Sequence, residues 1–309
     1  MVLNEFPDLI WLKRQISSRF ENRAGWNGRI LKEQGWPTVL LNVKTSGISR
    51  DNIKGPFSLF GNLKGSSFVK VDTRKVKVSE DHFFITNSGQ NYSLEIDDKS
   101  KTETFNIHFG DQFADQLIHS QSSSVEKIME ERFQTPIHSF SFHNRLIRKT
   151  KEINELLLEL QSNKDELKEE ELLSHLFIEL FREELKLTHA TKALPSIRES
   201  TRSELVKRIL LSTDYIHEFY NQQLTLGELA NTSCLSKFHF LRLFKIATGQ
   251  TPHQFITKVR IEKSKELLNN SNEEIKQIAD IVGFSDSSSF SRAFHQHVGA
   301  YPSQFRGLT

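Results

Sequence analysis

Residues 240–255 read FLRLFKIATGQTPHQF, and residues 290–305 read FSRAFHQHVGAYPSQF. The two segments repeat one another at an offset of 50 residues, and seven of their sixteen positions are identical. Identities of such varied chemistry indicate a structural unit that is present twice. The identical pairs are Phe240/Phe290, Arg242/Arg292, Phe244/Phe294, Gly249/Gly299, Pro252/Pro302, Gln254/Gln304 and Phe255/Phe305.

Each copy predicts two short helices joined by a tight turn. The first helices contain LGELANTS (226–233) and IKQIADIVG (275–283), which match at an offset of 49, so one copy has an additional residue near the turn. A Gly and a Pro follow each second helix and end it. This order is typical of a helix-turn-helix unit.

Small and polar residues mark the two turns. Gly283 suits a turn position that requires a positive φ. Cys234 takes the equivalent place in the first copy, where we expect its side chain to have a structural packing role. Ser236 and Ser285 are the predicted N-caps of the second helices.

The second helix of each copy has an apolar face and a complementary face at helical spacing. The phenylalanines of the apolar face would anchor a helix that presents hydroxyls or an arginine on its other side. The predicted core positions are Phe240, Leu243, Phe244 and Ala247, and Phe290, Ala293 and Phe294. The predicted outward positions are Phe238, Leu241, Arg242 and Lys245, and Ser288, Ser291, Arg292 and His295.

An outward arginine and short hydroxyls near a helix N-terminus suit contact with DNA. The N-terminus carries unsatisfied N–H groups and a partial positive charge, which favour phosphate. An arginine can make a bidentate contact to guanine in the major groove, and short hydroxyls let the helix approach the base edges closely. A lone arginine is more often a surface ion-pair residue, but the match between Arg242 and Arg292 favours DNA contact.

From about Leu226 to Arg306 the chain resembles the AraC/XylS family of transcription regulators. The matching motifs cover roughly a third of the chain and are LSKFHFLRLFKIATGQTPHQFI, the linking RIEKSKELL, and IADIVGFSDSSSFSRAFHQHVGAYPSQFR. The resemblance implies two helix-turn-helix subdomains joined by a long helix over about 255–269. Their recognition helices would enter successive major-groove segments about one helical turn apart.

The same resemblance assigns DNA contacts to nine residues. Phe238 and Leu241 make the outward face of the first copy unusually apolar, which suits thymine methyl groups or else weakens base reading there. The second copy lacks the longer amides that commonly read adenine, so base reading by its serines stays open. The nine residues are Phe238, Leu241, Arg242, Lys245, Ser287, Ser288, Ser289, Ser291 and Arg292.

The first half of the chain predicts β structure over residues 36–110. Short segments of alternating apolar and polar residues suggest a small sandwich or barrel, with Asn87–Gln90 as a hairpin turn between two strands. Their apolar residues, including Phe105, Ile107 and Phe109, are spaced to face one core. The segments are WPTVLLNV, SSFVKV, KVKVSE, HFFIT, NYSLEI and TFNIHF. The family resemblance implies a cupin-like β-barrel here, followed by helices that mediate dimerisation.

Two helices are predicted after the β region. The first carries a heptad-like seam of Leu146, Thr150, Ile153, Leu157 and Leu160, which suits an intramolecular helical hairpin or a subunit interface equally well. A turn at 163–165 precedes a second helix with a broad apolar stripe. The stripe consists of Leu172, Leu173, Leu176, Phe177, Leu180 and Phe181.

The expected fold class is α+β, with an N-terminal cupin-like β-barrel, a helical connector and an all-α domain of two helix-turn-helix units. The polar break at 120–124 and the stretch after Pro195 suggest the boundaries. The expected domains are an effector or sensor domain over 1–125, a connector over 126–200 and a DNA-binding domain over 201–309. The two helix-turn-helix units are expected at about 224–246 and 273–297.

The sequence shows little chemistry in its first half. His82 and His108 are isolated from one another, so the clustered ligands of metal-dependent cupins are missing, and a lone strand histidine is more often structural. We therefore expect no metal, no other cofactor and no enzymatic activity. Two alternatives are a cupin-type enzyme fused to a helical module, and a helical interaction protein without a DNA role.

The bulk composition sets weak limits. The net charge of +2 is almost neutral, although residues 201–309 hold 13 Lys and Arg against 10 Asp and Glu. One cysteine and no long apolar run favour a reducing cytoplasm and no membrane span. The expected partners are double-stranded DNA, a small-molecule effector, RNA polymerase and a second copy bound through residues 144–190. The expected role is that of a transcriptional activator.

Overall fold

The computed structural model describes residues 2–6, 38–97, 101–111, 113–114, 116–117, 141–163, 165–192 and 199–306. Contacts divide the chain into two units, residues 1–184 and 185–309, and the division falls within helix α5 (Glu166–Lys192). The three-domain division stays a prediction. The boundary signals at 120–124 and at Pro195 lie outside the described residues.

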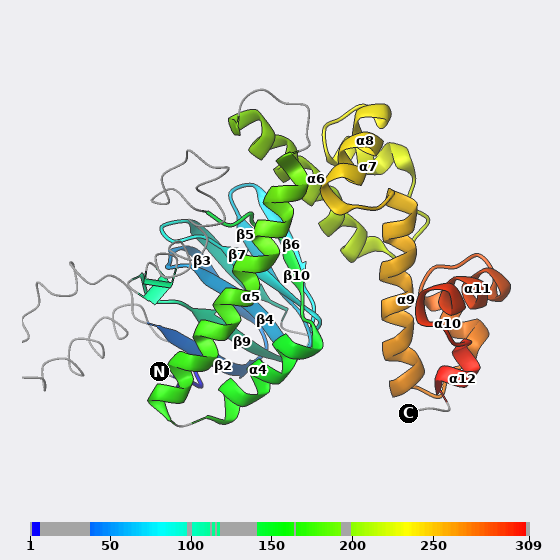
Figure 1. Ribbon diagram of the computed structural model, residues 1–309. Helices are drawn as coiled ribbons and strands as arrows, with labels where there is room; N and C mark the ends of the chain where they lie inside the picture. Colours follow the sequence, from blue (N-terminus) through cyan, green and yellow to red (C-terminus); the bar gives the residue numbers. More distant parts are fainter. Residues whose placement is uncertain are drawn as a thin grey trace, which may run out of the picture. The chain divides into compact units, whose positions relative to one another are not determined.

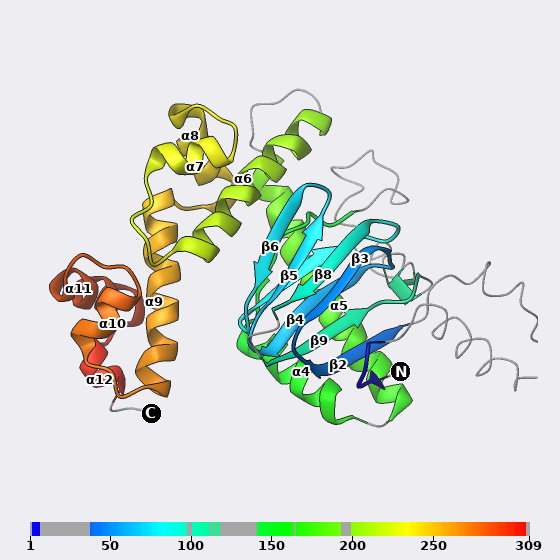
Figure 2. The same cartoon turned by 180° about the vertical axis from the view of Figure 1, so that it is seen from behind.

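The N-terminal unit contains two β-sheets, seen from opposite sides in Figure 1 and Figure 2. The larger sheet has the order β1 (Val2–Leu3), β2 (Val39–Thr45), β9 (Thr102–His108), β4 (Ser58–Lys64), β7 (His82–Thr86) and β10 (Leu146–Arg148). The smaller sheet has the order β3 (Ile48–Lys54), β8 (Asn91–Ile96), β5 (Ser67–Val71) and β6 (Arg74–Val78). The α+β class is confirmed, whereas the described strands form two separate sheets and do not establish a closed cupin-like barrel.

One apolar core joins the two sheets. Val69 and Val76 of the smaller sheet and Phe60 and Phe84 of the larger sheet are almost fully buried in it. Phe105, Ile107 and Phe109 were expected to face the same core, but the register places Ile107 beside Leu59, on the other face of the larger sheet. Phe109 accordingly packs against Phe177 of helix α5, with ring centroids 5.7 Å apart.

Two expectations about the strands were wrong or incomplete. The segment at 87–90 is a turn, but not a hairpin, because β7 and β8 belong to different sheets. Strands β3 and β4 were missed, because β3 is mostly polar and Gly61 interrupts the apolar pattern of β4. The tight hairpin lies instead between β5 and β6, where Asp72 takes a positive φ of 54°.

Helices α4 (Lys151–Ser162) and α5 cover the outer face of the larger sheet, as Figure 1 shows. The predicted seam is shorter than expected, because Leu146 lies in strand β10 and Thr150 is the N-cap of α4. Its helical members Ile153, Leu157 and Leu160 are all buried within this chain. These three residues are therefore covered within this chain rather than left free as an interface.

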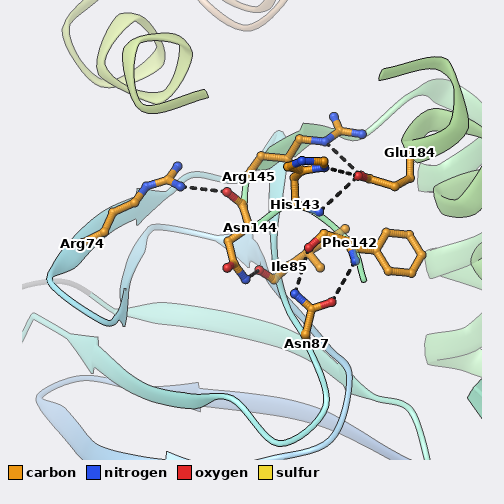
Figure 3. A network of polar contacts seen from close by, with 8 residues as sticks. All are labelled: Arg74, Ile85, Asn87, Phe142, His143, Asn144, Arg145 and Glu184. Atoms are coloured by element: carbon orange, nitrogen blue, oxygen red, sulfur yellow. Dashed lines mark hydrogen bonds and ion pairs between the residues drawn. The ribbon is translucent and has the colours of Figure 1, made fainter. Parts of the chain in front are cut away.

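A network of polar contacts ties residues 142–145 to strand β7 and helix α5 (Figure 3). Asn87 makes two hydrogen bonds with the main chain of Phe142, at 2.8 and 2.9 Å. The carboxylate of Glu184 accepts a hydrogen bond from the His143 main-chain N–H, contacts the His143 ring, and pairs with Arg145 at 3.5 Å. Glu184 is only 1% exposed, so this buried carboxylate depends on both partners.

Glu184→Gln should destabilise the N-terminal unit by about 3–5 kcal/mol, because it leaves the Arg145 guanidinium without its buried anion. Scanning calorimetry of the chain should show a lower unfolding temperature for the N-terminal unit. Glu171→Gln, an exposed carboxylate on the same helix, is the matched control and should change little. An unchanged unfolding temperature in Glu184→Gln would mean that the network contributes no net stability.

The C-terminal unit is helical. It contains α6 (Glu199–Phe219), α7 (Leu226–Thr232), α8 (Lys237–Thr248), α9 (Pro252–Asn270), α10 (Ile275–Ile281), α11 (Ser287–Val298) and α12 (Pro302–Arg306). Ile256 and Val259 of α9 enter a core with α6, α7 and α8, whereas Ile261 and Leu268 enter a core with α10 and α11. Within the described ranges, no helix has an apolar stretch long enough to cross a membrane.

Candidate nucleic-acid interface

The two turns have the same backbone geometry. Cys234 and Gly283 take positive φ values of 52° and 89°, as the repeat predicts. The N–H groups of the residues that follow, Leu235 and Phe284, each donate to the carbonyl of an alanine in the preceding helix at 2.9 Å. Cys234 was expected to pack structurally, but its side chain is exposed, so it contributes only its backbone conformation.

The additional residue of the second copy is Ser285. The hydrogen bonds match at an offset of 49 up to Phe284, and at an offset of 50 from Asp286 onward. Ser236 caps α8 as predicted, and its hydroxyl accepts from the main-chain N–H of His239. The predicted cap Ser285 was wrong: Asp286 caps α11 and accepts from Ser289 N–H at 2.7 Å.

Six of the seven identical pairs of the repeat have a structural role. Each glycine adopts the left-handed conformation that ends the second helix, at φ 73° and 83°. Each proline is the first residue of the next helix, and each glutamine accepts a main-chain N–H before that helix at 2.9 Å. The phenylalanines pack against one another in both copies at 5.3 to 5.7 Å between ring centroids.

The remaining pair, Arg242 and Arg292, is exposed in both copies. Among the described residues, neither guanidinium is ion-paired to a carboxylate. The ion-pair alternative for these arginines therefore has no support in the structure. The repeat retains an arginine at this place although folding does not use it.

The outward face of α8 is apolar and basic. Phe238 is 76% exposed and Leu241 is 40% exposed, and Arg242 and Lys245 are also exposed. The opposite face buries the four predicted core residues of this helix. An exposed phenylalanine beside two cations suits a surface that meets both bases and phosphates.

The outward face of α11 is polar. Ser288 and Arg292 are exposed, whereas Ser287, Ser289 and Ser291 are half-buried. The Ser289 hydroxyl donates to Asp286 at 2.8 Å, so this serine is engaged in the helix cap. His295 stacks on Tyr301, with centroids 4.4 Å apart. Ser288 and Arg292 are therefore the most accessible of the five predicted contact residues on this helix.

The two helix N-termini differ in charge. The hydrogen bonds from Ser289 lower the pKa of Asp286, so this carboxylate is ionised at neutral pH. A carboxylate at the N-terminus of α11 satisfies the N–H groups that would otherwise attract phosphate, whereas the cap of α8 is the neutral Ser236. Phosphate binding at a helix N-terminus thus suits α8 better than α11.

The chain matches the family model of a helix-turn-helix domain over residues 229–307. This range contains both repeated segments, 240–255 and 290–305, and the helix α9 that joins the two copies. Residues 229–307 form an AraC-type helix-turn-helix domain. The resemblance seen in the motifs is therefore confirmed for this part of the chain.

Similar proteins support the assignment of the AraC-type domain. The raffinose operon transcriptional regulatory protein RafR of Pediococcus pentosaceus is 32% identical over 36% of this chain and 40% of that protein. The HTH-type transcriptional activator Btr of Bacillus subtilis is 28% identical over 81% of this chain and 44% of that protein. The chain spans less than half the length of these two relatives.

One similar solved structure is the C-terminal domain of AraT, a response regulator from Geobacillus stearothermophilus. Its sequence is 32% identical to this chain, and the match covers 34% of this chain and 85% of the AraT domain, with a TM-score of 0.32.

The two strand histidines of the N-terminal unit make hydrogen bonds within the chain. His108 Nδ1 lies 2.8 Å from the Ser58 hydroxyl, and burial lowers the pKa of His108 to about 4, so its ring is neutral at neutral pH. His82 Nδ1 lies 2.9 Å from Asp81. In the part of the chain that the structure describes, no three histidine, cysteine, aspartate or glutamate side chains are grouped for metal binding.

The assignment of the cap can be tested with adjacent residues. Asp286→Ala should destabilise the C-terminal unit by about 1 kcal/mol, because the Ser289 N–H loses its acceptor. Ser285→Ala is the matched control and should have almost no effect, since Ser285 lies outside the helix. Thermal unfolding followed by circular dichroism would measure both, and a larger loss in Ser285→Ala would contradict the assignment.

Proposed function

We propose that the chain is a sequence-specific DNA-binding regulator of transcription whose two recognition helices, α8 and α11, read adjacent segments of the major groove. One observation carries this proposal. Among the identical pairs of the repeat, only Arg242 and Arg292 lack an intramolecular role in the described residues. A bidentate contact to guanine would account for an exposed arginine at the same place in both copies.

The two helices would read DNA in different ways. On α8, Phe238 and Leu241 suit thymine methyl groups, while Arg242 and Lys245 suit a base edge and a phosphate. On α11, Arg292 is the principal candidate for base reading. Ser288 supplies the most accessible short hydroxyl for a base edge or a phosphate, and the half-buried Ser287, Ser289 and Ser291 are proposed to contribute less.

The N-terminal unit is proposed to be a cupin-like effector domain, since cupins belong to the two-sheet jelly rolls. Its larger sheet has polar side chains on the face toward the smaller sheet, where Ser58, Thr86 and His108 share one side by register. In the part of the chain that the structure describes, buried atoms of Thr86, Thr104 and Asn106 have no hydrogen-bond partner. Such atoms support a polar effector or ordered water between the sheets.

The mechanism would be a shift between states. An effector that binds one arrangement of the two units more tightly would change promoter occupancy or contact with RNA polymerase. An activator role is supported by the name of Btr, which is called a transcriptional activator. Homodimer formation through residues 144–190 also stays a proposal, and the exposed Leu158 and Leu167 of that hairpin support it.

The first experiment is selection of a randomised duplex library by the chain at near-physiological salt. Two enriched half-sites about 10 base pairs apart would support base recognition by both α8 and α11. One enriched half-site would mean that one copy no longer reads bases. A folded chain that enriches no sequence, and whose DNA affinity does not fall with salt, would favour a helical interaction protein without a DNA role.

Arg242→Ala and Arg292→Ala should each reduce the affinity for the selected duplex by about 1–3 kcal/mol and relax the specificity at one position. Their thermal unfolding should not change, because neither guanidinium has an ion-pair partner within the described chain. Arg182→Ala, an exposed arginine of α5, is the control. If Arg292→Ala has unchanged specificity in a quantitative binding assay, Arg292 is not a reading residue.

The apolar face of α8 predicts sensitivity to thymine methyl groups. Replacing thymine by deoxyuracil in the half-site of α8 should weaken binding by about 0.8 kcal/mol for each contacted methyl. Phe238→Ala should bind more weakly and lose this sensitivity. The same base replacement in the half-site of α11 is the control, and equal effects in both half-sites would contradict a specific role for Phe238 and Leu241.

A further inference from the structure

The short segment 220–223, which follows α6, touches both helix-turn-helix units. Tyr220 packs against the core of the first unit and against the core of the second. The Gln223 side chain donates to the Gly283 carbonyl, in the turn of the second unit, at 3.3 Å. The segment therefore links the two helix-turn-helix units by contacts additional to the chain connection through α9.

Arg260 of α9 holds this segment. Its guanidinium donates to the carbonyls of Tyr220 and Gln222, both at 2.7 Å, just beyond the C-terminus of α6. The same group lies over the ring of Phe284, 5.7 Å from its centroid. Carbonyls at a helix C-terminus favour a cation, and only a planar fork can reach two of them while stacking on a ring.

The fit against the second unit is tight. A Cβ atom on Gly283 would lie 2.6 Å from the Asn221 carbonyl oxygen, closer than side-chain atoms approach a backbone. Gly283 is therefore required twice, for its positive φ and for this approach. Phe284 also packs on Phe290 of the recognition helix α11, with ring centroids 5.3 Å apart. The contacts of Arg260 with segment 220–223 and Phe284, called the clamp below, are therefore linked to α11 through one ring.

We propose that Arg260 is a positioning residue that, with segment 220–223, locks the two helix-turn-helix units together and sets the separation of their recognition helices. The consequence for DNA rests on the proposed function. A helix alone can bend, and each unit would then lose freedom on binding its half-site. With the clamp in place, both helices present themselves at one separation, so the chain should accept one half-site spacing.

The clamp can be tested without DNA. Two spin labels at His239→Cys and Gln296→Cys, on exposed positions of α8 and α11, report the distance between the recognition helices. Cys234→Gly removes the native thiol and keeps the positive φ, as Gly283 does in the second copy. Electron-electron double resonance of the labelled chain should give one narrow distance distribution.

Arg260→Met should broaden this distribution or add a second population, and Arg260→Lys should have an intermediate effect because an ammonium lacks the fork. Lys258→Met, an exposed cation on the same helix, is the matched control and should match the parent. If Arg260→Met does not fold, the distance distribution of Arg260→Lys provides the test. An equal width in Arg260→Lys and Lys258→Met would overturn the clamp.

Selected duplexes test the consequence. One or two base pairs inserted between the half-sites should weaken binding of the parent chain at least about tenfold. Arg260→Lys should bind the original duplex more weakly and distinguish the spacings by only about threefold. Unchanged discrimination would overturn the role of Arg260 in spacing. If no duplex is enriched, the proposed function fails, and the distance measurement still decides the clamp.

Discussion

Each helix-turn-helix unit depends on one phenylalanine ring in the middle of its second helix. Phe244 contacts Phe240 on its own helix and Phe255 on the next, at 5.3 and 5.5 Å, and is fully buried. The second copy repeats this arrangement around Phe294. A central ring in contact with two others sets which side of the helix is buried, so the side that meets solvent is determined as well. The reading surfaces follow from this packing.

The duplication kept the fold and changed the surface. Helix ends and aromatic packing are alike in both copies, and a side chain caps the second helix in each, because the loss of any of these would cost stability in that copy. The outward positions carry no such constraint. Phe238 and Leu241 in one copy thus correspond to serines in the other, and a neutral cap corresponds to Asp286. Such divergence suits two recognition helices that contact different bases.

The polar side chains have different roles in the two units of the chain. In the C-terminal unit, Ser236 and Asp286 cap the two second helices, and Arg260 holds one segment against another. In the N-terminal unit, the buried Glu184 network holds residues 142–145 against helix α5, while buried atoms of Thr86, Thr104 and Asn106 have no hydrogen-bond partner among the described residues. Paired groups rigidify a unit, and unpaired ones leave a place for a ligand or water.

By itself, the sequence determined the helix-turn-helix part of the C-terminal unit closely. The repeat identified both turns, the buried faces and the exposed arginines, because a pattern of helical period repeated twice leaves few alternatives. It misplaced the cap at Ser285, since it showed an additional residue but not where the backbone accommodates it. Only the tertiary structure decided that β7 and β8 lie in different sheets. It also decided that Arg260 clamps segment 220–223, because contacts between residues 40 positions apart leave no local pattern.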